Sequence, residues 1–219
     1  ACGARVARHQ RAGGEFAADL ALPDAPVALI ERVLERCGRL DYLVNNAAFT
    51  PPQPPRSPAA PSTDSFHHAA AEAGFDPALF DRAVAVNLRA PLALALAAAE
   101  RASTFEAVVT IGSAGTPRGN GSSAYFVASK GALPTLTRYL AHRLAPRVRV
   151  NALLLGLFDT EEIAARGPGF APLRDAVVAR TPMQRLGQPA EAAEVIVYLL
   201  AGNSFLTGSV LTLDGGWQL

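Results

Sequence analysis

One segment, residues 108–131, constrains the fold and the chemistry of this chain more than any other. It opens with an apolar, β-branched run typical of a buried strand, and a glycine- and serine-rich loop follows. A helix is expected to open near Ser122. Ser113, Tyr125 and Lys130 place a hydroxyl, a phenol and an amine along this segment. Beside the carboxyl end of a strand, such groups can polarise a carbonyl and relay a proton. The alternative is an ordinary polar loop ahead of a helix.

Length and composition indicate one globular α/β domain. The 219 residues can bury a sizeable core, since half are hydrophobic and only 18% are charged. A net charge of +1 without a basic run argues against nucleic acid as a partner. Apolar runs such as residues 91–99 are too short to span a bilayer, and no signal peptide is visible. We therefore expect a cytoplasmic protein without a membrane partner.

The cysteines and histidines predict neither a disulfide framework nor a metal site. Cys2 and Cys37 are too few for such a framework and lack metal-like spacing. His67 and His68 are adjacent, but no cysteine or carboxylate stands at ligand spacing from them. Two incidental thiols and no bound metal are expected.

Several further motifs, in order along the chain, resemble the short-chain dehydrogenase/reductase family. Residues 45–48 resemble its NNAG, Asn87 its structural asparagine, and residues 149–152 its RVNA. Residues 182–216 follow the family almost position for position. The resemblance covers about residues 18–219. It implies a Rossmann-like, doubly wound parallel sheet in a single domain.

The resemblance also implies a reaction, hydride transfer between a nicotinamide cofactor and a carbonyl, alcohol or imine carbon. By this resemblance, Ser113 hydrogen-bonds the substrate oxygen and Tyr125 donates or accepts the proton. Lys130 holds the nicotinamide ribose and lowers the phenol pKa through its charge. Asn87 closes the proton relay to solvent. A small-molecule substrate is the expected partner.

The spacing of Tyr125 and Lys130 departs from the family pattern, Tyr-x-x-x-Lys. The two residues are five apart, which rotates them by about 140° on a helix. Phe126 stands four before Lys130 and thirteen after Ser113, where the family keeps its acid. Three readings stay open: a working oxidoreductase, a catalytically impaired member that binds a dinucleotide or a partner, and a non-redox enzyme on the same fold.

The resemblance assigns cofactor contacts to both ends of a dinucleotide. Asp19 matches the aspartate beside the adenine ring, with a polar strand-end residue as the alternative. Asn45 and Ala47 are expected to face the adenosine side. Gly156 and Thr160 stand where the family surrounds the nicotinamide, although Leu155 replaces the usual proline.

The choice of dinucleotide depends on two arginines. Arg8 and Arg11 follow the expected second strand and are suited to pairing a 2′-phosphate. NADP is therefore favoured, and NAD remains possible.

The N-terminal region does not match a complete family member. No glycine-rich turn precedes the first helix, and Gly3-Ala4-Arg5-Val6 resembles the entry to the second strand. The next strand, residues 15–20, follows after about eight residues, whereas parallel neighbours need a crossover of a dozen or more. The first strand, the glycine-rich turn and a crossover helix are therefore expected to be missing, through truncation or through absent segments.

Periodicity and turn residues predict the remaining elements. Expected helices cover residues 26–38, 76–100, 133–144 and, buried, 190–200. Expected strands cover residues 40–44 (buried), 147–155 and 209–213. A proline-rich insertion covers residues 50–65 and a substrate-covering lobe covers residues 157–182. The insertion, Phe49 and the terminal DGGWQL suggest the pteridine reductase branch. By resemblance, paired helices imply a homo-dimer or homo-tetramer.

Overall fold

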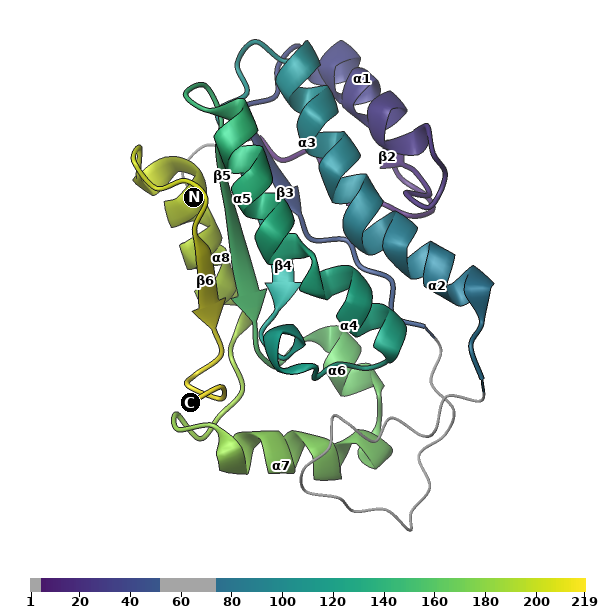
Figure 1. Ribbon diagram of the computed structural model, residues 1–219, viewed down its shortest axis with the longest axis vertical. Coiled ribbons are helices and arrows are strands. Elements are labelled where there is room, and N and C mark those ends of the chain that lie inside the picture. Colours follow the sequence, from purple (N-terminus) through teal and green to yellow (C-terminus); the bar gives the residue numbers. More distant parts are fainter. Residues whose placement is uncertain (1–4, 52–73) are drawn as a thin grey trace.

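A parallel four-stranded sheet forms the centre of the molecule in this computed structural model, which describes residues 5–51 and 74–219 (Figure 1). The strand order is β3-β4-β5-β6, and each neighbouring pair is parallel. A separate two-stranded parallel sheet precedes it in the chain. The bounds are β1 His9–Gln10, β2 Phe16–Ala17, β3 Tyr42–Asn45, β4 Ala107–Ser113, β5 Arg149–Leu155 and β6 Val210–Leu213.

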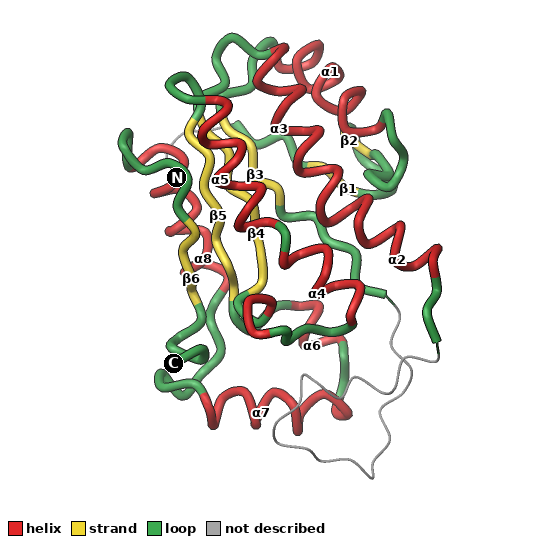
Figure 2. Tube along the Cα trace, viewed as in Figure 1, coloured by secondary structure: helices red, strands yellow, loops and turns green. Residues whose placement is uncertain are grey.

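Helices fill most of the connections between these strands (Figure 2). The α-helices are α1 Ala25–Cys37, α2 Pro77–Val84, α3 Ala90–Arg101, α4 Ala124–Gly131, α5 Leu133–Leu144, α6 Glu161–Ala165, α7 Ala171–Arg180 and α8 Pro189–Val197. Shorter turns of 3₁₀- or π-helix are η1 Ala85–Arg89, η2 Thr116–Arg118, η3 Pro168–Phe170 and η4 Tyr198–Gly202.

Alternate residues of β4 face opposite cores, as the period of a strand requires. Val108 packs with residues of α1, α3 and α5 in one core. Val109 and Ile111 pack with residues of η4 in a second, smaller core. Helices thus cover both faces of the sheet, and the predicted Rossmann-like α/β fold is confirmed.

The longest helical run, Pro77–Arg101, joins α2, η1 and α3. By length and composition alone it is long and apolar enough to cross a membrane, with a mean hydropathy of 1.4. However, 61% of the apolar window is buried inside the fold, as expected for a core helix. Its apolar side chains therefore contribute to the core, and Asn87 lies in the π-helical turn at its middle.

Two predicted strands differ from those found. The strand expected at residues 40–44 is not buried, because β3 is an edge of its sheet; Tyr42 and Val44 are 37% and 39% exposed. The second strand begins at His9, later than expected, and the described Val6 is exposed. β1 and β2 are parallel although no helix joins them. Gly13 and Gly14, with φ of 75° and 81°, turn the chain between them.

Other predicted elements are found close to their expected bounds. The helix over residues 133–144 is α5, and the long helix over residues 76–100 is the run from α2 to α3. The helix expected at residues 190–200 is only partly buried, since Val197 and Tyr198 are about half exposed. The proline-rich insertion lies outside the described residues except for Thr50 and Pro51.

The carboxyl ends of β4 and β5 point toward α4, α6 and α7 (Figure 1). In open parallel sheets this edge is where ligands bind. The candidate site is therefore expected at the carboxyl ends of these strands.

Candidate functional site

The N-terminus of α4 sets the orientation of the side chains that the sequence singles out. Ser123 is the N-cap, and its hydroxyl accepts a hydrogen bond from the Phe126 N–H at 3.1 Å. The helix therefore begins at Ala124, and Tyr125 is already inside a regular turn. The rotation of about 140° between Tyr125 and Lys130 is maintained in the structure.

Lys130 lies against β4. Its Nζ donates to the Ile111 carbonyl at 2.7 Å, and the side chain is only 4% exposed. Burial lowers the pKa of Lys130 to about 8. Because Ile111 precedes Ser113 by two residues, the amine is held beside the strand that carries the candidate serine.

Tyr125 faces α2. Its hydroxyl accepts a hydrogen bond from the Asp76 N–H at 2.7 Å, and its ring makes edge-on contacts with Phe75 and Phe80. The side chain is 6% exposed. Within the described part of the chain, no acceptor is found for the phenol's own proton.

Phe126 shares the helix face of Lys130, because residues four apart lie above one another. A Cβ built on Gly121 would lie 3.0 Å from the Phe126 ring, so this ring covers the loop before the helix. The phenol and the amine therefore leave α4 on different faces, and a phenylalanine occupies the position next to the amine.

Asn87 connects three elements at the site. It is fully buried, its Oδ1 accepts from the Phe49 N–H at 2.7 Å, and its Nδ2 donates to the Phe49 carbonyl at 2.9 Å. The same Nδ2 lies 3.0 Å from the Ser129 hydroxyl, which donates to the Tyr125 carbonyl at 2.7 Å. Asn87 thus anchors α4 to the turn after β3.

Three predicted site residues lie at or just after the carboxyl ends of β4 and β5: Ser113, Gly156 and Thr160. Ser113 ends β4 and is half-buried, and Leu155 of β5 is its neighbour in the ladder. Gly156 follows at once, and a Cβ there would lie 2.8 Å from Asp214 Cβ, so this close approach requires glycine. Thr160 caps α6 by accepting from the Ile163 N–H at 3.3 Å.

Asn45 is the last residue of β3, and Ala47 lies in the segment that follows. Asn45 is buried, and its Nδ2 donates to the Thr110 hydroxyl at 3.3 Å. Its Oδ1 is buried without a hydrogen-bond partner among the described residues. Ala47 is exposed and small. An orphaned acceptor beside small, exposed residues fits the donor groups of a nucleotide.

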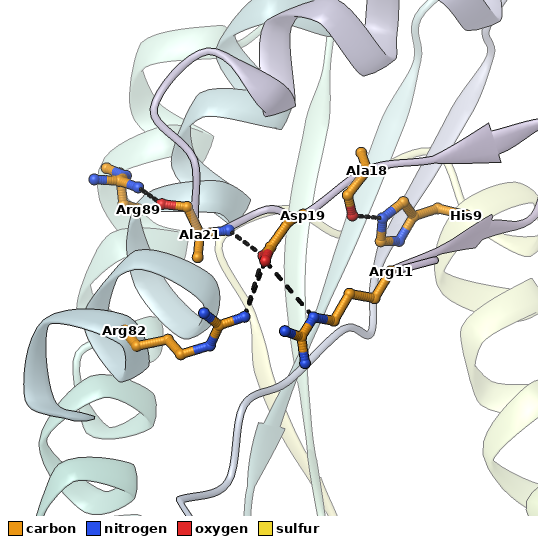
Figure 3. Close-up of polar contacts among 7 residues, drawn as sticks. All are labelled: His9, Arg11, Ala18, Asp19, Ala21, Arg82 and Arg89. Carbon is orange, nitrogen blue, oxygen red and sulfur yellow. Dashed lines mark hydrogen bonds and ion pairs between the residues drawn. The ribbon is translucent and has the colours of Figure 1, made fainter. Parts of the chain in front are cut away.

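Asp19 lies at the centre of an arginine cluster (Figure 3). It accepts from the Ala21 N–H at 3.0 Å and from Arg82 Nη2 at 3.0 Å, and Arg11 Nε lies 3.6 Å away. The Ala21 amide and the Arg82 guanidinium hold the pKa of the Asp19 carboxyl below its ordinary value. Arg8 is exposed and belongs to no ion pair within the described residues.

A cavity of about 280 Å³ opens between α2 and α4. It is lined by Gly74, Phe75, Phe80, Ala124, Tyr125 and Ala128. No described group of three or more His, Cys, Asp or Glu residues is placed to hold a metal ion.

The sequence pattern does not indicate two residues that hold this site together. Ser129 lies four after Tyr125 and bonds Asn87, a spacing that can be seen in the sequence but has no distinctive motif. Arg82 pairs with Asp19 across 63 residues, and no local pattern reports a contact at that separation.

Comparison with known proteins identifies the family. A sequence profile described as enoyl-(acyl carrier protein) reductase matches residues 3–218. The 1-cyclohexenylcarbonyl-CoA reductase of Streptomyces collinus is 32% identical over 98% of this chain and 72% of the relative.

Solved structures agree with the sequence comparison. A short-chain dehydrogenase/reductase from Brucella melitensis has a TM-score of 0.75 and 27% identity, covering 93% of this chain and 75% of that one. A blue fluorescent protein from a metagenomic library, solved in complex with NADPH, has a TM-score of 0.74 and 25% identity at the same coverage. The chain therefore belongs to the short-chain dehydrogenase/reductase family of oxidoreductases.

Proposed function

We propose that this chain is an NADP-dependent oxidoreductase that transfers a hydride to or from a carbonyl or alcohol carbon. The observation that carries the proposal is the position of Lys130. Its buried amine donates to the carbonyl of Ile111 in β4, two residues before Ser113 at the carboxyl end of that strand. NADPH supplies the hydride when it is bound, and NAD is the second candidate cofactor. The solved NADPH complex of a structural neighbour supports the choice of NADP.

Each site residue has a defined task in this proposal. Ser113 hydrogen-bonds the substrate oxygen, and Lys130 holds the nicotinamide ribose. Tyr125 donates the proton to the substrate oxygen, since its own proton lacks an acceptor among the described residues. Asn87 joins the proton relay and, through Ser129, fixes α4, the helix that carries Tyr125 and Lys130.

The cofactor contacts divide between the two ends of the dinucleotide. Asn45 Oδ1, Ala47 and Asp19 serve the adenosine end, where a buried acceptor still lacks a donor among the described residues. Arg8 and Arg11 pair the 2′-phosphate, because both are exposed and Arg11 projects beside Asp19. Gly156 and Thr160 serve the nicotinamide end.

The lobe over residues 157–182 is proposed to cover the substrate, because α6 and α7 lie beyond the carboxyl ends of the strands (Figure 1). A pterin-like imine remains a candidate substrate beside carbonyls and alcohols. A homo-dimer or homo-tetramer is the proposed assembly.

A second candidate function is favoured by one observation, the orientation of Tyr125. Its hydroxyl is bound by the Asp76 N–H on the α2 side, while Phe126 shares the face of Lys130. A member with this arrangement binds a dinucleotide or a partner without turnover.

Cofactor binding and turnover separate the two candidates. Fluorescence titration of the full-length protein with NADPH and NADH measures binding, and a panel of carbonyl and pterin substrates measures turnover. An oxidoreductase binds NADPH and oxidises it with at least one substrate. Binding without turnover favours the second candidate, and failure to bind either cofactor contradicts both dinucleotide functions.

A further inference from the structure

Arg82 joins two segments that are far apart in the chain. Its Nη2 donates to Asp19 Oδ2 at 3.0 Å and to Oδ1 at 3.4 Å, across 63 residues (Figure 3). The guanidinium carbon also lies 5.3 Å from the centroid of the Phe49 ring. Because the Arg82 and Asp19 side chains are only 30% and 29% exposed, this pair is less screened by solvent than most ion pairs at the surface.

The contacts continue from Phe49 to α4. Asn87 holds both backbone groups of Phe49, the N–H at 2.7 Å and the carbonyl at 2.9 Å. Asn87 also donates to Ser129, whose hydroxyl donates to the Tyr125 carbonyl. An unbroken set of contacts thus runs from Asp19 to the helix that carries Tyr125 and Lys130.

We propose that Arg82 is a positioning residue that couples the Asp19 turn to the Phe49–Asn87 contacts beside α4. The assignment of Asp19 to the adenine end rests on the proposed function. One planar cation contacts the carboxylate and the aromatic ring together, so replacing it breaks both contacts at once. Asp19 keeps its bond from the Ala21 N–H and its ion pair with Arg11. Among the described hydrogen bonds, Phe49 then keeps those between its backbone and Asn87. Binding of the cofactor's adenine end is then no longer coupled to α4 through Arg82.

Arg89 provides a matched control. It lies in the same helical run and donates to the Ala21 carbonyl, in the turn that contains Asp19. In the described ranges it forms no ion pair with Asp19 and no cation–π contact with Phe49. Arg89→Met therefore removes an arginine that contacts the same turn without breaking the contacts that carry the inference.

The test compares Arg82→Met and Arg89→Met in the full-length protein. Hydrogen exchange of the peptide over residues 45–51 measures how firmly Phe49 is held, and NADPH binding and kcat are measured beside it. Arg82→Met is expected to speed exchange of the Phe49 amide about tenfold, weaken NADPH binding about tenfold and lower kcat. In Arg89→Met, exchange and kcat are expected to stay within about twofold of wild type.

A double mutant separates coupling from a merely structural effect. With Phe49→Leu added to Arg82→Met, the loss of kcat is expected to be smaller than the product of the two single losses, because the two residues share one interaction. Arg82→Lys retains the charge and is expected to recover part of the exchange protection. It also provides a folded variant if Arg82→Met unfolds.

The inference and the proposed function fail in different ways. Wild-type exchange of the Phe49 amide in Arg82→Met overturns the inference, whether or not NADPH binds. Independent, multiplicative losses in the double mutant also overturn it. If the wild type binds neither NADPH nor NADH, the proposed function fails while the exchange comparison still decides the role of Arg82.

Discussion

The two faces of α4 present different chemistry to different neighbours. One face carries Phe126 and Lys130, with the lysine bound to β4 and the phenylalanine over the loop at Gly121. The other carries Tyr125 and Ser129, which contact α2 and Asn87. A single residue of displacement along a helix turns a side chain by about 100°, so it changes the element that the side chain meets.

In the family pattern, Tyr-x-x-x-Lys, the phenol and the amine share one face of the helix, whereas here they lie on different faces. The amine lies beside the strand that ends in Ser113, whereas the phenol lies against the rings of Phe75, just before α2, and of Phe80 within it. In the proposed function, proton transfer from Tyr125 is therefore made from the α2 side of the helix. We infer that turnover is limited by the placement of the phenol.

Removing the phenol is the change with the largest expected effect. Tyr125→Phe is expected to lower kcat about 10²–10⁴-fold, because general acid catalysis contributes about that factor. The measurement is NADPH oxidation with the best substrate of the panel. Unchanged NADPH binding serves as the control. A variant that keeps the wild-type rate would show that the α2 face takes no part in the chemistry.

Replacing the buried amine tests the other face through stability. Burial lowers the pKa of Lys130 to about 8 from its ordinary 10.5, so the unfolded chain binds more protons between these pH values. The free energy of unfolding therefore rises with pH across this window, and below it the charged amine destabilises the fold by a constant amount. Lys130→Met is expected to raise the free energy of unfolding at pH 7 by about 2 kcal/mol.

The same variant predicts a change in pH dependence. In urea unfolding followed by circular dichroism, the contribution of Lys130 between pH 8 and 10.5 is expected to disappear in Lys130→Met. Loss of cofactor binding by this variant is expected from its proposed contact with the ribose. Equal pH profiles for wild type and variant would mean that the amine is well solvated.

Ser129→Ala removes a hydrogen bond on the face of α4 that carries Tyr125 and leaves the contacts of the Lys130 amine unchanged. It removes one of the two acceptors of Asn87 Nδ2, and the bond to the other, the Phe49 carbonyl, stays. The expected loss in the free energy of unfolding is about 1.5 kcal/mol, that of a buried hydrogen-bond partner. Urea unfolding measures it. No loss of stability would indicate that Asn87 is held by Phe49 alone.

The smallest expected effect concerns the N-cap of α2. Asp76 Oδ1 accepts from the Ala78 and Leu79 N–H groups at 2.9 and 3.2 Å, so Asp76→Ala is expected to cost about 1 kcal/mol. Asp24→Ala is a matched control, because Asp24 stands at the N-cap of α1 and makes no side-chain cap bond. Equal losses in the two variants would contradict the capping role of Asp76.

Local pattern predicts the helices and their relation to the sheet. The helix expected at residues 133–144 has the same bounds as α5, and the long run containing Asn87 is a core helix. The burial of β3 is not predictable in this way, because an apolar strand has the same pattern at the edge and at the centre of a sheet.

Contacts across long separations and side-chain directions need the folded chain. The direction of Tyr125 depends on where α4 begins, and one hydrogen bond from Phe126 to Ser123 defines that start. The pairing of Arg82 with Asp19 has no local signal at all. The sequence therefore predicts the residue types of the site, and the structure adds which of them face one another.

The most direct test of the account exchanges the residues of the two faces. In the double variant Tyr125→Phe/Phe126→Tyr, the phenol stands four residues before Lys130 and on its face. We predict that kcat for NADPH oxidation exceeds that of the wild type by about tenfold or more, with Tyr125→Phe alone as the inactive control. A double variant as inactive as Tyr125→Phe would contradict the claim that the placement of the phenol limits turnover.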